Sequence, residues 1–242
     1  MPKARPAYSS RPSAFSGKNL NRYTFDSNGI PTAQDSNVIS SYFQELETSS
    51  NGNATAKSIT NFKNSVAQNG GYYIGRYEAR TATARSAKID ALTQITERGT
   101  EQIYNYVTQL QAAQLSQNMY TSDKFTSDLM NSYAWDTATV FIQNCGTNSK
   151  YSTQTSLNKT LSQTGTNSLT DTSKIDLQCN IYDMASNIRE WTTETCDGSG
   201  SPCVFRGGNY GTSDFYTSYR GAYLTSNSFA WVGFRPLLYV NV

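Results

Sequence analysis

The chain of 242 residues contains no histidine. This absence excludes Ser-His-Asp and Cys-His catalysis, histidine-ligated zinc or iron, and a pH switch based on histidine. The sequence also lacks any run of about 18 apolar residues, so we expect no membrane insertion. Charged residues are scarce, at 16%, and the net charge of +2 favours no particular partner. Nucleic acid is therefore not among the expected partners.

Cysteine is also sparse, and its spacing predicts no metal site. The four cysteines include no CxxC pair, and they allow three disulfide pairings. Cys196 and Cys203 flank the turn-forming sequence DGSGSP, which places them opposite each other across a hairpin. The sequence is thus consistent with a Cys196–Cys203 disulfide or with free thiols.

The N-terminal segment has a composition of its own. Residues 1–22 carry five basic side chains and no acid, which is consistent with an arm that docks on a partner or with a tail lacking fixed structure. We expect residues 1–57 to form this arm and one helix, with a role in assembly or docking. An apolar signal-peptide core is missing from the first 20 residues, which favours a virion or an intracellular assembly.

Apolar spacing predicts helices in the first part of the chain and irregular strands in the last 65 residues. A long loop of Ser, Thr, Asn and Gln separates the two parts. The order of helices before strands is typical of an α+β domain. The predicted helices lie at 35–50, at 55–69 before Gly70 and Gly71, once or twice within 85–118, and at about 123–143; the strand is 72–79 and the loop is 144–175.

Four segments, in this order, resemble the formylglycine-generating-enzyme-like branch of the C-type lectin fold. They are NGGYYIGRYEA (69–79), AWDTATVFIQ (134–143), NIYDMASNIREWTTE (180–194) and VFRGGNY…GFRPLLYV (204–240). The ordered set is specific, although any one segment alone is a weak signal. The resemblance covers roughly 58–242 and implies a compact lectin-like domain with few regular elements and an exposed C-terminal face.

The residues of these motifs have clear physical roles. Trp191 is expected to be a buried anchor whose indole N–H needs an acceptor. Gly207, Gly208 and Gly233 allow tight turns or close packing of the backbone. Arg206 and Arg235 are expected to brace loops through carboxylates or carbonyls.

The residues on which the known enzymes of this family depend are missing. Oxidase members carry two cysteines just after Arg-Gly-Gly, but the corresponding segment here, NYGTSDFYTSYR, contains none. The sulfoxide synthases bind iron through histidines, which this chain lacks. We therefore expect a protein that is not an enzyme; a divergent enzyme of the same fold is one alternative.

The same fold without catalytic residues resembles the variable proteins of diversity-generating retroelements. There, adenines in AAC or AAT codons are replaced at random, and no such replacement yields Lys, Glu, Gln, Met or Trp. None of these five residue types occurs among the 24 residues 207–230, whereas Tyr, Ser, Thr, Asn and Gly fill 17 of them. This composition also resembles an antibody paratope. The resemblance therefore implies a hypervariable region at about 207–231.

The expected ligand-binding positions lie in this region, with Trp231 as a fixed residue at its end. They are Asn209, Tyr210, Gly211, Thr212, Ser213, Asp214, Phe215, Tyr216, Thr217, Tyr223, Leu224, Thr225, Ser226, Asn227, Ser228, Phe229 and Trp231. The main anchors are expected among the aromatic residues Tyr210, Phe215, Tyr216, Tyr223 and Phe229. Tyr219 and Arg220 are expected to belong to the scaffold. An ordinary polar loop with half-buried aromatic residues is the simpler alternative.

The resemblance also implies a calcium site, because some family members bind Ca²⁺ near the Asp-Met-Ala-Gly-Asn run. The matching ligands here are Asp183, Ser186, Ile188 and Glu190, with the second and third acting through backbone oxygens. Hard oxygen ligands suit Ca²⁺. However, Ser186 replaces the usual glycine, and Asp183 and Glu190 are equally consistent with hydrogen-bonded scaffold residues.

Together these observations predict a non-enzymatic protein that binds a protein or glycan receptor on a cell surface. Display on a phage tail or on a cell surface is expected, with assembly, including a homo-oligomer, through the N-terminal region. A structural virion or surface protein whose Tyr-rich face makes fixed contacts is the further alternative.

Overall fold

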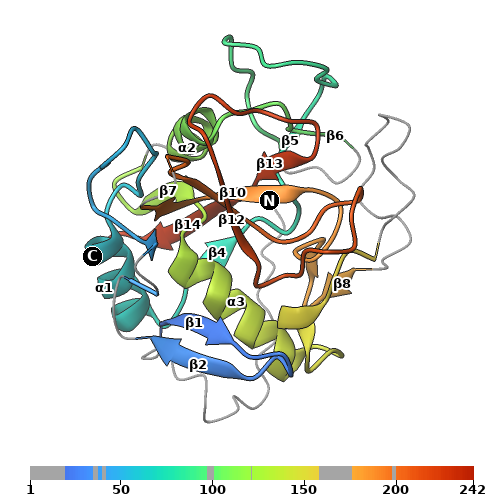
Figure 1. Cartoon of the computed structure of the whole chain (residues 1–242). Helices are drawn as coiled ribbons and strands as arrows, with labels where there is room; N and C mark the ends of the chain where they lie inside the picture. Colours follow the sequence, from blue (N-terminus) through green and yellow to red (C-terminus); the bar gives the residue numbers. More distant parts are fainter. Residues whose placement is uncertain are drawn as a thin grey trace.

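The computed structural model describes most of the chain in an α+β arrangement (Figure 1). The described residues are 20–34, 38–39, 42–96, 101–120, 122–157, 176–197 and 200–242. The sequence predicted the α+β class, and this class is confirmed. Most of residues 1–22 and of the loop 144–175 lie outside the described residues. Among the described residues, no helix is both long and apolar enough to cross a membrane.

The described part contains three α-helices, one short 3-10 helix and fourteen short strands. The helices are α1 (Ile59–Asn69), α2 (Gln109–Gln117), α3 (Ser132–Cys145) and the 3-10 helix η2 (Tyr151–Thr153). The strands are β1 (Arg22–Phe25), β2 (Pro31–Gln34), β3 (Phe43–Gln44), β4 (Tyr73–Ile74), β5 (Arg80–Thr81), β6 (Gln102–Ile103), β7 (Phe125–Leu129), β8 (Leu177–Gln178), β9 (Ile181–Tyr182), β10 (Arg189–Cys196), β11 (Cys203–Arg206), β12 (Arg220–Tyr223), β13 (Val232–Phe234) and β14 (Pro236–Val240).

Strand β10 is the centre of the largest sheet, and every one of its residues is buried. The strands follow the order β12-β11-β10-β13, and β3 also pairs with β10. β13 runs parallel to β10, whereas β11 and β3 are antiparallel to it. After β13 the chain passes Arg235 and enters a second sheet as β14, between β4 and β7. Arg235 therefore lies where the two sheets join.

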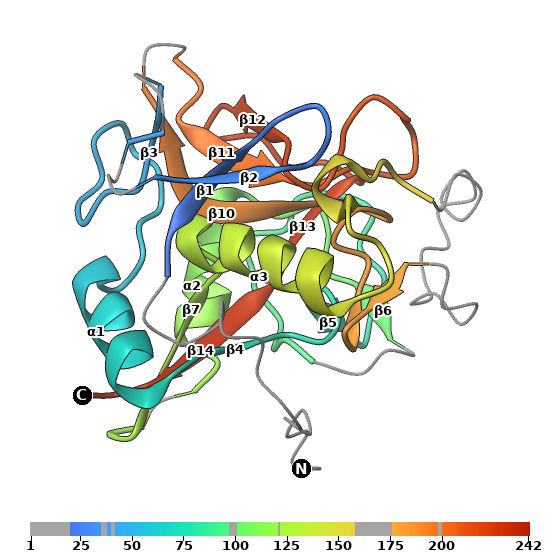
Figure 2. The ribbon, with the colours of Figure 1, turned by 90° about the horizontal axis from the view of Figure 1, so that it is seen from below.

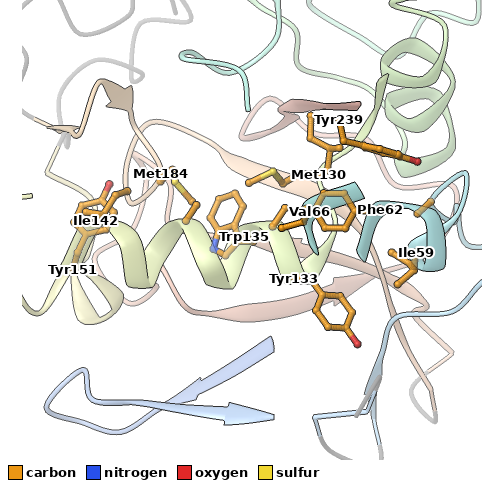
Figure 3. Close-up of a cluster of buried hydrophobic side chains, with 14 of the residues drawn as sticks. Ile59, Phe62, Val66, Met130, Tyr133, Trp135, Ile142, Tyr151, Met184 and Tyr239 are labelled. Atoms are coloured by element: carbon orange, nitrogen blue, oxygen red, sulfur yellow. The ribbon is translucent and has the colours of Figure 1, made fainter. Parts of the chain in front are cut away.

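Helix α1 forms where the sequence predicted it. Ser58 caps its start by accepting a hydrogen bond from the Asn61 backbone N–H, and Gly70 ends it in the left-handed conformation with φ 77°. Its apolar side packs against β14. Figure 3 shows Phe62 beside Tyr239, and their ring centroids are 5.4 Å apart.

Helix α3 lies between the β1–β2 hairpin and the core (Figures 1 and 2). Asn131 caps its start by accepting a hydrogen bond from the Ala134 backbone N–H. On the hairpin side, Asp136 accepts a hydrogen bond of 2.9 Å from the Tyr23 backbone N–H. On the other side Trp135 is fully buried in a cluster with Met184 and Met130 (Figure 3). Burying a side chain of this size stabilises the fold by about 3 kcal/mol.

Three predicted helices differ from the structure. In 35–50, Val38 forms a bridge to Gln44, and β3 pairs with β10. The β-branched and aromatic residues there favour a strand, and β10 supplies a partner. Where one or two helices were predicted between 85 and 118, α2 is the helix that forms among the described residues of this range, and Thr96 instead pairs with Arg80 through two backbone hydrogen bonds. The helix predicted from 123 begins only at Ser132, since β7 pairs with β14. The strand expected at 72–79 is limited to β4.

Of the two alternatives for Cys196 and Cys203, the structure has thiols rather than a disulfide. All four cysteines lie in the described part of the chain, and all are thiols. The strand register pairs Cys203 with Thr195 rather than with Cys196. Because successive side chains of a strand point to opposite faces, a shift of one residue directs the two thiols apart.

Candidate functional site

The start of the C-terminal segment is fixed by a buried network of charges around Arg206. Its guanidinium lies 2.6 Å from an Asp136 oxygen and 3.4 Å from a Glu194 oxygen. Arg220 contacts the same two acids, and Arg22 of β1 contacts Glu194. Burial alone would raise the pKa of Asp136, but Arg206 and Arg220 outweigh it and lower the pKa. The network joins β1, α3, β10, β11 and β12.

The other end of the segment is fixed by Arg235. This side chain makes two hydrogen bonds to Glu190, of 2.7 and 3.1 Å, and donates to the carbonyls of Gly75 and Tyr182. The predicted bracing roles of Arg206 and Arg235 are both confirmed. The predicted anchor Trp191 is also confirmed: it is fully buried, and its indole N–H donates to the Val107 carbonyl at 2.8 Å.

Two glycines let the chain turn immediately after Arg206. Gly207 has φ 78°, and a Cβ atom there would lie 2.7 Å from the Met184 carbonyl oxygen. At Gly208 a Cβ atom would lie 2.6 Å from the Ala185 carbonyl oxygen and 2.8 Å from that of Phe215. Any larger residue would force these backbones apart, so the pair sets where the following loop begins.

The four predicted calcium ligands lie close together in sequence, and the calcium site stays a prediction; the side chain of Glu190 already has another partner. Both carboxylate oxygens of Glu190 already accept hydrogen bonds from Arg235. The guanidinium therefore occupies the position beside this carboxylate that a cation would need. The Ser186 hydroxyl accepts from the Leu157 backbone N–H, and the Ile188 N–H donates to Glu78. Asp183 is buried close to the same Glu78 carboxyl.

Apart from Tyr223, which is the last residue of β12, the predicted ligand-binding positions lie on two loops, one between β11 and β12 and one between β12 and β13 (Figure 1). Tyr216, Leu224 and Trp231 are 40%, 50% and 37% exposed. The smaller exposed positions are Gly211, Ser213, Asp214, Thr225 and Ser226. The half-exposed ones are Tyr210, Thr212, Phe215, Tyr223, Asn227, Ser228 and Phe229. Most of the predicted positions are therefore accessible.

Asn209 and Thr217 are corrections to that prediction, because both are buried. The Thr217 carbonyl accepts the Trp135 indole N–H at 2.9 Å, and its hydroxyl donates to the Gln154 carbonyl at 3.3 Å. The Asn209 side chain accepts a hydrogen bond from the Gly211 backbone N–H at 3.1 Å. These two side chains hold the first loop in place and cannot contact a ligand in this conformation.

Rings from both loops and from the sheet form one aromatic cluster. Tyr223 lies at its centre, with its ring centroid 4.7 Å from that of Phe205 and 4.9 Å from that of Phe229. Phe229 stacks on Trp231 at 5.0 Å. The other members are Trp191, Phe215, Tyr216 and Tyr219. The mixture of stacked and edge contacts stabilises the loops and leaves an aromatic face toward solvent.

Sequence reasoning missed Arg189, which lies beneath this cluster on β10. Its guanidinium carbon is 4.1 Å from the ring centroid of Phe215 and 4.8 Å from that of Phe205. It donates a hydrogen bond of 2.6 Å to the Tyr223 hydroxyl. Burial lowers the pKa of this guanidinium, although the neighbouring tyrosines oppose the shift. An arginine directly before Glu190 was the only signal in the sequence.

Two thiols with raised pKa and one open pocket lie outside this face in the described part of the chain. Burial raises the pKa of the Cys203 thiol to about 12, and burial with the neighbouring Cys145 raises that of Cys179 to about 11. Cys179 and Cys203 are therefore almost entirely in the thiol form at neutral pH. An open pocket of about 350 Å³ lies between residues 92–95 and α2, and no acid or base is among its lining residues.

Comparison with known proteins gives no family. No protein-family profile and no curated protein sequence matches the chain. Two solved structures are similar at 16% identity. The crystal structure of CarF has a TM-score of 0.34 over 48% of each chain, so this chain spans about half the length of CarF. Treponema denticola variable protein 1 has a TM-score of 0.43 over 69% of this chain and 84% of that one.

Proposed function

We propose that this chain is a non-enzymatic ligand-binding protein with a hypervariable C-terminal face on a C-type lectin-like domain. A single observation carries the proposal: two loops rich in Tyr, Ser and Asn are exposed, while their ends are held by buried ion pairs. Arg206 fixes the start of the first loop, and Arg235 follows the end of the second. Such an arrangement tolerates changes in the loops because the fold does not depend on them.

The chemistry of the exposed face supports binding to a macromolecule. Tyr and Trp offer large rigid contacts at low entropic cost, and Ser, Thr and Asn offer adaptable hydrogen bonds. Tyr216 and Trp231 are exposed aromatic residues beside such polar positions. A few aromatic anchors surrounded by polar contacts are typical of protein interfaces.

The resemblance to retroelement variable proteins extends the proposal to the origin of the variation. The receptor is a protein or glycan on a cell surface, and the chain is displayed on a virion or a cell surface. Repeated copies would strengthen weak single contacts through avidity. The raised thiol pKa values and the lack of cysteine after Gly208 support the non-enzymatic part of the proposal.

Two measurements test the proposal. Sequencing the neighbouring DNA is expected to find a reverse-transcriptase gene and a near-copy of the last hundred or so bases. Independently, a phage-displayed library varied at Ser213, Asp214, Tyr216, Thr225 and Ser226 is panned against immobilised serum albumin. We expect folded binders from this library but none from a control library varied at the buried Thr217 and Ser218. Equal numbers of folded binders from both libraries, or none from either, would contradict a displayed face.

A further inference from the structure

Arg189 is the one buried arginine of the described chain whose side chain contacts neither a carboxylate nor a carbonyl. It is only 6% exposed. Five other arginines contact carboxylates, and Arg85 donates to three backbone carbonyls. Arg189 has only the Tyr223 hydroxyl. The five paired arginines are Arg22, Arg80, Arg206, Arg220 and Arg235.

The geometry leaves one edge of the Arg189 guanidinium unused. The rings of Phe215 and Phe205 cover it at 4.1 and 4.8 Å, and Tyr223 occupies Nη1. Nε is buried without a hydrogen-bond partner, and Nη2 donates no hydrogen bond within the described chain. Nε and Nη2 share one edge of the planar group, and two parallel N–H bonds from such an edge match a carboxylate.

The energetics call for an anion at this edge. An arginine stays charged at any physiological pH, so it cannot relieve its burial by losing a proton. Contact with aromatic rings attracts the cation only modestly, and a buried charge without an opposite charge is costly. A ligand carboxylate on this edge would supply the missing charge and the missing acceptors together.

The cover over Arg189 belongs to the segment that we propose to vary. Arg189 itself lies on the buried strand β10, but Phe215 lies on the first loop and is half-exposed. The position of the Arg189 guanidinium is therefore fixed by the scaffold, while the position of Phe215 on the loop determines how accessible this guanidinium is to a ligand. A carboxylate at the tip of a methylene stem can enter edge-on between two rings. A carboxylate attached directly to a sugar ring would bring that bulky ring against the same aromatic side chains.

We propose that Arg189 is a fixed anion-binding site beneath the variable face, and that it takes the carboxylate of an aspartate or glutamate side chain of a protein ligand. This inference rests on the proposed function, because it assigns the chemistry of that same face.

The test titrates the full wild-type chain, and a folded Arg189→Lys variant is needed only to assign the signal. The Arg189 Nε–Hε NMR signal, assigned by its loss in Arg189→Lys, is followed while acetyl-aspartate amide is added. We expect a saturable shift in the millimolar range, and none with the neutral isostere acetyl-asparagine amide. Phe215→Ala is expected to strengthen binding severalfold by opening the edge. An unchanged signal, or equal shifts with both amides, would overturn the inference.

A third probe separates protein from glycan ligands. Methyl glucuronide carries its carboxylate on a sugar ring, and we expect it to bind Arg189 more weakly than acetyl-aspartate amide. Stronger binding of the glucuronide would overturn the assignment to a protein ligand. The library described above distinguishes the two levels of proposal. If its members bind serum albumin while the Arg189 signal never moves, the anion site is wrong and the binding face stands.

Discussion

Arg206 and Arg189 lie on neighbouring strands of one sheet, and both are buried, yet their surroundings differ. Arg206 contacts the carboxylates of Asp136 and Glu194. Arg189 contacts aromatic rings and one tyrosine hydroxyl. The first cation is neutralised inside the protein and joins five elements of the fold. The second is insulated by rings, one of which belongs to a loop. The scaffold thus pairs its own arginines with carboxylates, whereas the face above Arg189 leaves one arginine for the carboxylate of a partner.

The largest expected effect comes from replacing each of these arginines with methionine. Arg206→Met removes its hydrogen bonds to two buried carboxylates and to the Ser218 and Tyr219 carbonyls, while Arg220 and Arg22 still contact the acids. We expect a loss of about 3–5 kcal/mol in the free energy of unfolding, because buried acceptors lose their donors. Arg189→Met removes a cation that has no carboxylate, so the free energy is expected to stay constant or to rise by about 1 kcal/mol. Urea denaturation of both variants measures the difference. Similar losses would mean that Arg189 is as structural as Arg206.

The second prediction compares two buried glutamates by their response to pH. Glu45 has no arginine pair, and burial raises its pKa from 4.5 to about 7 despite hydrogen bonds from Ser132 and Thr193. Burial also acts on Glu194, but Arg220, Arg22 and Arg206 lower its pKa. Because the pKa of Glu45 is higher in the folded state, the folded protein binds a proton at this carboxyl group more tightly than the unfolded chain does. The contribution of the protonated Glu45 to the free energy of unfolding is therefore complete below pH 4.5 and is lost as the pH rises to about 7.

Glu45→Gln removes this titration. The stability of the wild type relative to the variant is expected to fall by roughly 3 kcal/mol between pH 4.5 and 7.5. Glu194 acts in the opposite direction, because its stabilisation is lost as the pH falls below 4.5. Urea denaturation from about pH 3 to about pH 7.5, repeated with Glu194→Gln, gives both profiles. If the free energy of unfolding depends on pH in the same way in the wild type and in Glu45→Gln, the pKa of Glu45 is not raised by folding and the prediction is wrong.

The sequence was most informative where local signals and the motif agreed. Helix α1 has its cap, its apolar spacing and its terminal glycine within one short segment, so periodicity alone located it. Arg206 and Arg235 were predicted as braces because the motif places them beside glycines. The helix expected at 35–50 failed because an apolar spacing of that length fits a strand equally well, and only β10 decided between them.

The candidate site was harder to predict where it depends on contacts between distant segments. Arg189 is separated from Tyr223 by 34 positions. Its place beneath the aromatic cluster is visible only in the folded chain, where Tyr223 and Phe215 contact it. Asn209 and Thr217 are residue types that are common on binding loops, yet both are buried and hydrogen-bonded within the fold. The Cys196–Cys203 pairing failed because a register shift of one residue leaves no trace in the sequence. Residue types therefore indicated the face, but not which of its members are structural.

The smallest expected effects concern the exposed loop positions, and a matched pair of serines tests them. Ser226 is exposed, whereas the Ser218 hydroxyl is buried and donates to the Ser152 carbonyl at 2.9 Å. Ser226→Ala is expected to change the free energy of unfolding by less than about 0.5 kcal/mol. Ser218→Ala removes this buried hydrogen bond, while the Ser218 backbone N–H still donates to the Ser152 carbonyl at 3.0 Å, and the change is expected to cost about 1 kcal/mol. Thermal denaturation of both variants checks the contrast. Equal losses would place the second loop in the scaffold, since a surface that varies freely must contribute little to the stability of the fold beneath it.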